Sequence, residues 1–331
     1  MKTDDYKQAV ADWIKTHPTH TKVIIVAVLV VLFCIIFVSC KGKNEPPKPP
    51  VKPPVQKTVV PPASVPDAPV QIPDAPGDNT VTDVDAPSSE LSAEHTVTLP
   101  NNVELKLVRI SKGSFVAGSP GSESGRAPGA AERQRNVNIA NDFYIGVYEV
   151  TQDQYQAVTG QNPSRFKAAN LPVERVSWDN AMMFCEKLNV GGYAPAGWKF
   201  ALPSSGQWEY ACRAGTKTPF FWGKTLDGSR ANCNGTQPYG TTRKGAYLKK
   251  TSPVGSYDPN PWGIYDMHGN VWEWCNDSSS VNRKGRRIQA REIRGGSWGT
   301  GAVQCRAASR LSINLKSAKM TIGFRVVLVK E

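Results

Sequence analysis

Thiol or imidazole chemistry would have to come from seven cysteines and four histidines in a chain of 331 residues. Five of the cysteines lie beyond the N-terminal apolar segment, and they are widely spaced. No Cys-x-x-Cys pair indicates a metal site, and an odd number does not indicate a disulfide framework. Hydrolytic catalysis also lacks a recognisable set of side chains. We therefore interpret Cys185, Cys212, Cys233, Cys275 and Cys305 as small buried thiols that pack as apolar residues.

A sixth cysteine, Cys40, indicates a covalent lipid anchor. It directly ends the uncharged apolar run 23–39, and a small residue, Ser39, precedes it. This pattern is typical of a lipoprotein processing site that leaves Cys40 as the lipidated first residue. In the alternative, the run is an uncleaved anchor helix that just reaches across a layer of roughly 30 Å. Either interpretation of segment 1–40 predicts an exported, membrane-anchored protein, and we favour an outer membrane lipoprotein at the cell surface.

A proline-rich segment, 41–94, follows the apolar run. Half of the 26 prolines lie between Pro46 and Pro87, and the motif Pro-Asp-Ala-Pro occurs twice. Such a composition cannot bury a core, so we expect a disordered, partly polyproline II tether. At about 3.1 Å per residue where it is stiff, the tether would hold the following domain on the order of 100 Å from the membrane.

The charge is strongly basic, with a formal net charge of +12. The basic residues are densest between Arg283 and Arg294. No nucleic-acid motif and no interleaved aromatic residues accompany them, so we interpret this stretch as a solvated loop and predict no nucleic-acid partner.

Few regular elements are expected in the rest of the chain, 95–331. Apolar residues alternate along 97–110 as in a strand. Helical spacing follows Thr151 over 151–158 and follows a Ser177 cap over 177–188. Short strand-like runs and abundant Gly and Asn fill the remainder, which favours the α+β class.

A series of segments in this part resembles the sulfatase-modifying-factor family, whose best-known member is the formylglycine-generating enzyme. The resemblance implies a C-type-lectin-like α+β fold that is rich in irregular structure. We interpret most of the shared Trp, Glu and Arg residues as core anchors and buried ion pairs. The segments are Gly113-Ser-Phe-Val-Ala-Gly118, Tyr148-Glu-Val-Thr-Gln-Asp-Gln-Tyr155, Leu171-Pro-Val-Glu-Arg-Val-Ser-Trp178, Leu202-Pro-Ser-Ser-Gly-Gln-Trp-Glu-Tyr-Ala-Cys-Arg-Ala-Gly215, Gly263-Ile-Tyr-Asp-Met-His-Gly-Asn-Val-Trp-Glu-Trp-Cys275, Arg294-Gly-Gly-Ser-Trp298, Cys305-Arg-Ala-Ala-Ser-Arg310 and Gly323-Phe-Arg-Val326.

The family's catalytic residues are not matched. Formylglycine-generating members use a Cys-x4-Cys pair that binds copper shortly after the Gly-Gly-Ser-aromatic motif, as soft thiolates suit copper(I). Here that stretch holds Cys305 alone. Another branch uses three histidines in an attached domain, which this chain also lacks. We therefore predict no catalytic residues, no required cofactor and no enzymatic activity.

A structural calcium ion is the one metal that the resemblance implies. Its ligands would be the carboxylates of Asp266 and Glu273 and the backbone carbonyls of Gly269 and Val271, all hard oxygen donors. In the alternative, this loop is held by its own hydrogen bonds.

The segment between Gly-Gly-Ser-Trp and Gly-Phe-Arg departs from the asparagine-rich loops of the family. It resembles the variable proteins of diversity-generating retroelements, whose asparagine codons are rewritten at adenines. That chemistry implies a variable ligand-binding face in an exposed loop. In the alternative, the loop sequence has changed by ordinary evolutionary drift. The candidate positions are Gly299, Thr300, Gly301, Val303, Ser309, Leu311, Ser312, Ile313, Leu315, Ser317 and Thr321.

These observations favour a surface-displayed lipoprotein whose variable C-terminal face binds an unknown extracellular ligand, a protein or another macromolecule. One alternative is an invariant envelope scaffold or accessory lipoprotein with the same domain. The other is an oxidase of the formylglycine-generating type, which the missing Cys-x4-Cys pair disfavours.

Overall fold

The computed structural model describes residues 92–127, 131–283 and 286–331. Segment 1–40, Cys40 and nearly all of the tether 41–94 lie outside these residues, so the predicted anchor, lipidation and disorder stay predictions. Within the described part, no helix has both the length and the apolar character needed to cross a membrane.

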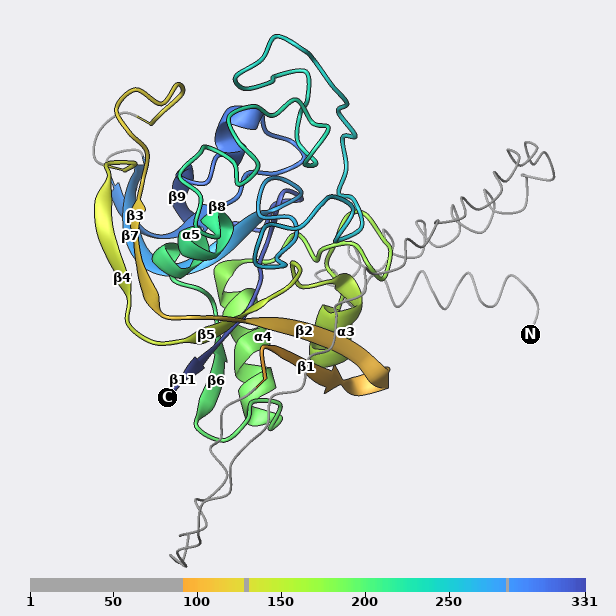
Figure 1. The fold of residues 1–331 in the computed structure, drawn as a ribbon. Coiled ribbons are helices and arrows are strands. Elements are labelled where there is room, and N and C mark those ends of the chain that lie inside the picture. Colours follow the sequence, from red (N-terminus) through yellow and green to blue (C-terminus); the bar gives the residue numbers. More distant parts are fainter. Residues whose placement is uncertain (1–91, 128–130, 284–285) are drawn as a thin grey trace, which may run out of the picture. The chain divides into compact units, whose positions relative to one another are not determined.

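A five-stranded antiparallel sheet forms one side of the domain (Figure 1). The predicted strand over 97–110 is in fact a hairpin, because the turn η1 (Pro100–Asn102) divides it and Asn101 adopts a positive φ of 62°. The order of the strands is β1 (Glu94–Leu99), β2 (Val103–Ile110), β5 (Phe143–Gly146), β11 (Val327–Lys330) and β6 (Trp198–Ala201).

Of the three α-helices in the described residues, two begin where the sequence predicts them. Helix α3 (Gln152–Thr159) follows a capping box at Thr151, and α4 (Trp178–Val190) follows one at Ser177. A third helix, α5 (Ser205–Arg213), was not predicted, although Ser204 and Gln207 form the same capping box. This arrangement satisfies the first backbone N–H groups of each helix.

A second sheet carries the C-terminal segment of interest. Its order is β10 (Ile322–Gly323), β7 (Trp272–Arg283), β8 (Arg286–Arg294) and β9 (Arg310–Asn314), and β9 is therefore an edge strand. The hairpin of β3 (Gly113–Ala117) and β4 (Arg135–Ile139) stands apart as a two-stranded sheet. The 3-10 turn η2 (Ala302–Cys305) lies between β8 and β9.

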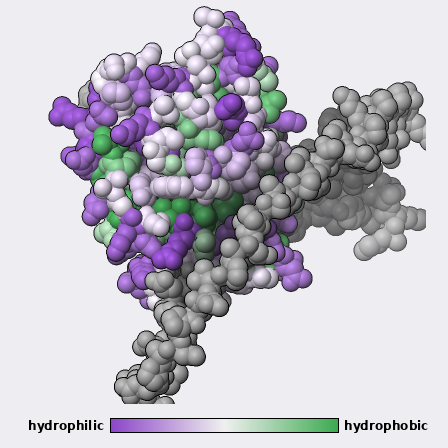
Figure 2. All heavy atoms as spheres, viewed as in Figure 1, coloured by the Kyte–Doolittle hydropathy of each residue, from purple (hydrophilic) through white to green (hydrophobic). Residues whose placement is uncertain are grey.

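Large aromatic residues fill the core, as the sequence predicts. Trp274 and Phe324 belong to a cluster that includes residues of α3 and α4, and Trp208 belongs to a second cluster with Met267. Between α5 and β7 the chain runs from 214 to 271 without a helix or named strand. The fold is thus α+β and rich in irregular structure. On the face seen in Figure 2, polar side chains dominate the surface.

Candidate functional site

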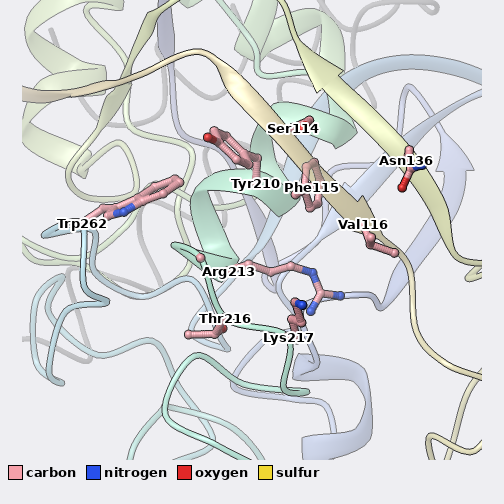
Figure 3. Close-up of a pocket in the computed structure, with 10 residues that line it drawn as sticks. Ser114, Phe115, Val116, Asn136, Tyr210, Arg213, Thr216, Lys217 and Trp262 are labelled. Atoms are coloured by element: carbon pink, nitrogen blue, oxygen red, sulfur yellow. The ribbon is translucent and has the colours of Figure 1, made fainter.

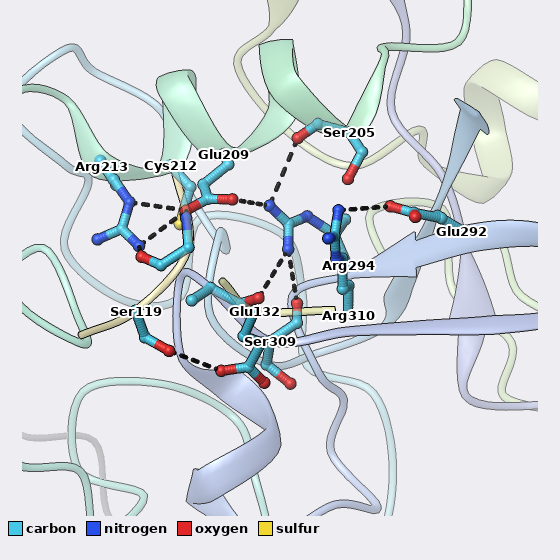
Figure 4. A network of polar contacts seen from close by, with 12 residues as sticks. Ser119, Glu132, Ser205, Glu209, Cys212, Arg213, Glu292, Arg294, Ser309 and Arg310 are labelled. Carbon is cyan, nitrogen blue, oxygen red and sulfur yellow. Dashed lines mark hydrogen bonds and ion pairs between the residues drawn. The ribbon is translucent and has the colours of Figure 1, made fainter. Parts of the chain in front are cut away.

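A buried ion-pair network fixes the backbone just before β9. Arg294 is fully buried, pairs with Glu209, and donates to the carbonyls of Ala308 and Ser309 at 3.0 Å each (Figure 4). Glu209 also accepts two hydrogen bonds from Arg213. Burial alone would raise the pKa of Glu209, but the two guanidinium groups outweigh it and hold that pKa below its ordinary value. The start of β9 is therefore held by charge-assisted bonds.

A second network fixes η2. Arg306 donates to Glu123 at 2.6 Å, to Glu132 at 2.8 Å and to the Val303 carbonyl at 2.9 Å. It also donates to the carbonyl of Gly125 at 2.8 Å. Both carboxylates and the guanidinium are nearly inaccessible to solvent. Arg306 therefore joins η2 to the loop that carries the two glutamates, as the predicted role of a buried pairing partner requires.

The third network contains the predicted calcium ligands. Arg325 donates to both oxygens of Glu273, at 2.6 and 2.8 Å, and Trp208 donates its indole N–H to Glu273 at 2.7 Å. The carboxylate of Asp266 accepts the N–H of Gly255. Both oxygens of Glu273 thus accept hydrogen bonds, Oε1 only the one from Arg325, and its role as a calcium ligand stays a prediction. The described residues also contain no group of three or more His, Cys, Asp or Glu placed to hold a metal ion.

The charge of this region nevertheless favours a cation. Three buried carboxylates, those of Glu149, Asp266 and Glu273, lie near the single guanidinium of Arg325. Burial, and then the charges of Asp266 and Glu273, raise the pKa of Glu149 well above its ordinary value. Burial raises the pKa of Asp266 to about 6. Calcium at this loop therefore stays a prediction, with Asp266, Glu273 and the carbonyls of Gly269 and Val271 as its candidate ligands.

We predict that chelation with EDTA lowers the Tm of the full chain at about pH 7.5 and that this effect fades toward about pH 5, because protons compete for Asp266. Asp266→Asn should remove the sensitivity, while Asp153→Asn, at an exposed acid in the first turn of α3, should keep it. Differential scanning calorimetry with and without EDTA measures both. If EDTA does not change the Tm, the loop binds no calcium, and these carboxylates serve only as hydrogen-bond acceptors.

The predicted variable residues fall into two groups. In the first, Gly299 is exposed and lies against Thr321, and Val303 is half-buried beside Gly125. The carbonyl of Thr300 accepts the N–H of Asn234 at 2.8 Å. Gly301 is buried against Gln237, which leaves it little accessible surface to offer a ligand and corrects its place on the predicted face.

The second group lies on β9 and just after it, which corrects the expected exposed loop. Residues 310–314 pair with β8 in antiparallel register, so the alternation of Leu311 and Ile313 belongs to a strand. Leu311 is 46% exposed and Ser312 is also exposed, but Ile313 is half-buried and packs on the core. Ser309 is buried beneath Arg294, which removes it from the accessible face.

The remaining positions follow the strand on a backbone that several hydrogen bonds fix. Leu315 and Ser317 are half-buried, and the Leu315 carbonyl accepts the N–H of Trp178. The indole of Trp298 donates to the carbonyl of Met320 at 3.1 Å. The side chain of Met320 is 46% exposed. Met320 is not among the candidate positions that the sequence predicts, so only the structure places it at this surface.

Leu311 and Ile313 of β9 differ in exposure, so the same substitution should have a different cost in stability at each of them. Leu311→Asn should change the free energy of unfolding by less than about 0.5 kcal/mol, because the side chain is largely exposed. Ile313→Asn should cost about 1–3 kcal/mol, because it places an amide against the core. Urea denaturation of the two single variants measures the difference. Equal costs would mean that the two side chains share one environment.

A separate cavity of about 550 Å³ lies beside α5 and the β3–β4 hairpin (Figure 3). Phe115, Tyr210 and Trp262 line it together with Lys217, and the rings of Tyr210 and Trp262 meet edge to face with centroids 4.9 Å apart. The Arg213 side chain at its wall is already bound to Glu209. None of the predicted variable residues lines this cavity, so it is distinct from the C-terminal face.

The described thiols are all buried, and His268 is buried beside two of them. One ring nitrogen of His268 lies 2.7 Å from the carbonyl of Cys305, and the other lies 3.7 Å from the sulfur of Cys212. Burial lowers the pKa of His268 to about 4 and raises that of Cys212 to about 12. At neutral pH this holds a neutral imidazole beside a neutral thiol, without an activated nucleophile.

Comparison with solved structures shows a shared fold. Treponema denticola variable protein 1 matches with a TM-score of 0.59 at 24% identity, over 72% of this chain and 99% of that one. PvdO from Pseudomonas aeruginosa matches with a TM-score of 0.55 at 27% identity, over 68% of this chain and 94% of that one. These neighbours support the fold that the sequence resemblance implies.

Comparison of sequences gives the family. The chain is 34% identical to Chaperone protein LppX of Paenibacillus barcinonensis, over 43% of this chain and 64% of the relative. It is 36% identical to the formylglycine-generating enzyme of Streptomyces coelicolor and 32% identical to an inactive formylglycine-generating enzyme 2 of Mus musculus, over 47% of this chain in each case. It spans 52% and 48% of those two relatives. The family model of the sulfatase-modifying factor enzyme 1-like domain matches residues 93–330, and the chain belongs to this family.

Proposed function

We propose that this protein is a non-enzymatic, surface-displayed binding protein, and that it holds an extracellular macromolecule on the accessible face around β9. We define this C-terminal face by its accessible or half-buried candidate positions. They are Gly299, Thr300, Val303, Leu311, Ser312, Ile313, Leu315, Ser317 and Thr321, with Met320 added from the structure.

The observation that carries the proposal is exposed apolar surface on a fixed backbone. Leu311 on β9 and Met320 just before β10 are both 46% exposed, yet a hydrogen bond from Arg294 near the first and one from Trp298 at the second fix the backbone there. Exposed apolar side chains on a rigid scaffold suit recognition, because little conformational entropy is lost when a ligand binds to them. The edge position of β9 in its sheet is also one to which a partner strand can add.

The fold is suited to a variable face. Residues of the face lie at the sheet edge and in loops, where substitutions cost less stability than in the core. Treponema denticola variable protein 1 shares the fold and carries variability in its name. Diversification of the C-terminal face is therefore part of the proposal.

Deep sequencing of the gene from one clonal culture tests diversification. Substitutions should concentrate in the codons of the C-terminal face, at bases where the template carries adenine. The codons of α5, a buried helix of nine residues, serve as the control window. A nearby reverse transcriptase gene with an adenine-differing copy of the 3′ end should accompany them. Equal substitution rates in both windows would remove diversification from the proposal.

Surface display and binding need a second experiment. Cells that carry an epitope tag after Glu331 should lose the tag to external protease while intact.

The full chain should also bind intact cells of a host or neighbouring species in flow cytometry, and Leu311→Asp with Met320→Asp should abolish this binding. The matched control is Leu248→Asp, which changes another exposed leucine outside the face and should bind as the wild type does. Equal binding by all three proteins would contradict recognition through this face.

A second candidate function is that of an envelope accessory protein, which the similarity to Chaperone protein LppX favours. It predicts an invariant C-terminal face and binding that does not depend on Leu311. The same two experiments therefore separate it from the first candidate.

A further inference from the structure

Two buried thiols from distant parts of the chain meet beneath the C-terminal face. Cys233 lies in the long irregular segment and Cys305 ends η2, and both belong to one small core cluster with Phe220, Leu226 and Ala302. The backbone on either side of this cluster is joined by a parallel β-bridge between Asn234, next to Cys233, and Gly301, four residues before Cys305. Neither is more than 1% exposed.

The backbone around the two thiols holds them in this position. The N–H of Asn234, next to Cys233, donates to the carbonyl of Thr300 at 2.8 Å. The sulfur of Cys305 lies 3.9 Å from the hydroxyl of Thr300 and 3.9 Å from the carbonyl of Gly301. On the other side, a Cβ added to Gly296, whose φ is +76°, would lie 2.5 Å from this sulfur. Only glycine fits there, so Cys305 has little room to turn away from Cys233.

We propose that Cys233 and Cys305 form a disulfide bond in the mature protein. The inference rests on the export that the proposed function includes, because disulfides persist in oxidising compartments outside the cytoplasm. The remaining described cysteines are Cys185, Cys212 and Cys275. This revises our interpretation of all five as thiols that only pack.

The bond forms by exchange with an oxidant that is itself a disulfide. The thiolate of one cysteine attacks a sulfur of the oxidant, forms a mixed disulfide and releases one thiol. The second thiolate then attacks the protein sulfur of that mixed disulfide and releases the second thiol. The two cysteines lose two protons and two electrons, and the oxidant is reduced to two thiols. Because both sulfurs are buried, the exchange takes place during folding and is slow afterwards.

The bond would stabilise the support of the C-terminal face. It closes a loop of about 70 residues between the two cysteines, which restricts the unfolded chain strongly. It also ties η2 and Thr300 covalently to the segment around Asn234. The face can then vary in sequence while the loop beneath it keeps its position.

The test refolds the full chain in detergent with a mixture of oxidised and reduced glutathione, blocks free thiols after unfolding, and maps peptides by mass spectrometry. We expect one cross-linked peptide pair that contains Cys233 and Cys305, and a Tm about 10 °C above that of the reduced protein. Cys185→Ala, at another buried thiol, should keep the bond. Cys233→Ala should lose it and leave Cys305 open to alkylation.

Mapping of the wild type decides the question even if a variant fails to fold. Complete alkylation of both cysteines after oxidative refolding would overturn the bond, and so would a link from Cys305 to Cys212. Protein that is taken from cells and alkylated at lysis shows whether the bond forms in vivo, and so tests export to an oxidising compartment. A bond that forms in vitro but is absent in cells would contradict export and leave the geometry intact, which separates failure of the inference from failure of the proposed function.

Discussion

Arg325→Ala should lower the free energy of unfolding by about 3–5 kcal/mol, the cost of leaving one member of a buried ion pair without its partner. Arg325 and Glu273 are both 0% exposed. The guanidinium also donates to the carbonyls of Gly146 at 2.9 Å and of Tyr265 at 2.9 Å. Its loss therefore leaves a buried carboxylate and two carbonyls without this donor at the junction of the two sheets.

The exposed pair of Lys106 and Glu104 is the matched control. Its nitrogen and oxygen lie 3.2 Å apart, but both side chains are more than half exposed. Lys106→Ala should therefore cost less than about 1 kcal/mol. Urea denaturation of both variants at equal ionic strength gives the comparison. Similar costs would contradict the view that burial makes the Arg325 pair essential.

The cost of Arg325→Ala should also depend on pH. Arg325 lowers the pKa values of Glu149 and Asp266, which burial raises, so its removal raises both further. A carboxyl whose pKa is raised on folding stabilises the fold below its unfolded pKa and loses that contribution as the pH rises through the folded pKa. The deficit of the variant should therefore shrink near about pH 5 and grow above about pH 6. A deficit that is constant with pH would exclude these carboxylates as its cause.

The elements that the sequence predicts are those with strong local signals. The capping residues Thr151 and Ser177 mark α3 and α4 because one side chain satisfies the backbone at the start of each helix. The same capping signal precedes α5 at Ser204, within the family motif 202–215, and was not used to predict a helix. The turn at Asn101 was missed because the alternation of apolar residues resumes directly after it.

The candidate site was less predictable, because edge position is a property of the whole sheet. Alternation at Leu311 and Ile313 indicates a strand, but only the pairing with β8 shows which side chain faces the core. The meeting of Cys233 and Cys305 in one core cluster depends on a fold that brings distant segments together, and no spacing rule predicts it. The buried pairs of Arg294 and Arg325 were predicted from the family motifs and are confirmed.

Arg306→Ala should destabilise the protein by about 3–5 kcal/mol as well, because it leaves Glu123 and Glu132 buried together without a cation. The like charges would then repel each other in a region of low dielectric. The double variant Glu123→Gln with Glu132→Gln on the Arg306→Ala background should recover part of the loss, since amides carry no charge to bury. Chemical denaturation of the single and triple variants measures this recovery.

A second substitution at Arg306 tests the support of the C-terminal face separately from the face itself. Arg306 holds the Val303 carbonyl and the loop at Gly125, so Arg306→Lys, which keeps the charge but not the forked donor set, should loosen η2 in a domain that still folds. Hydrogen exchange should become faster around 299–305 and stay unchanged in α4, whose own capping box is remote from Arg306. If the face depends on this support, binding to intact cells should fall in Arg306→Lys although Leu311 and Met320 are untouched. Wild-type exchange and binding in this variant would show that η2 needs only a positive charge at this position.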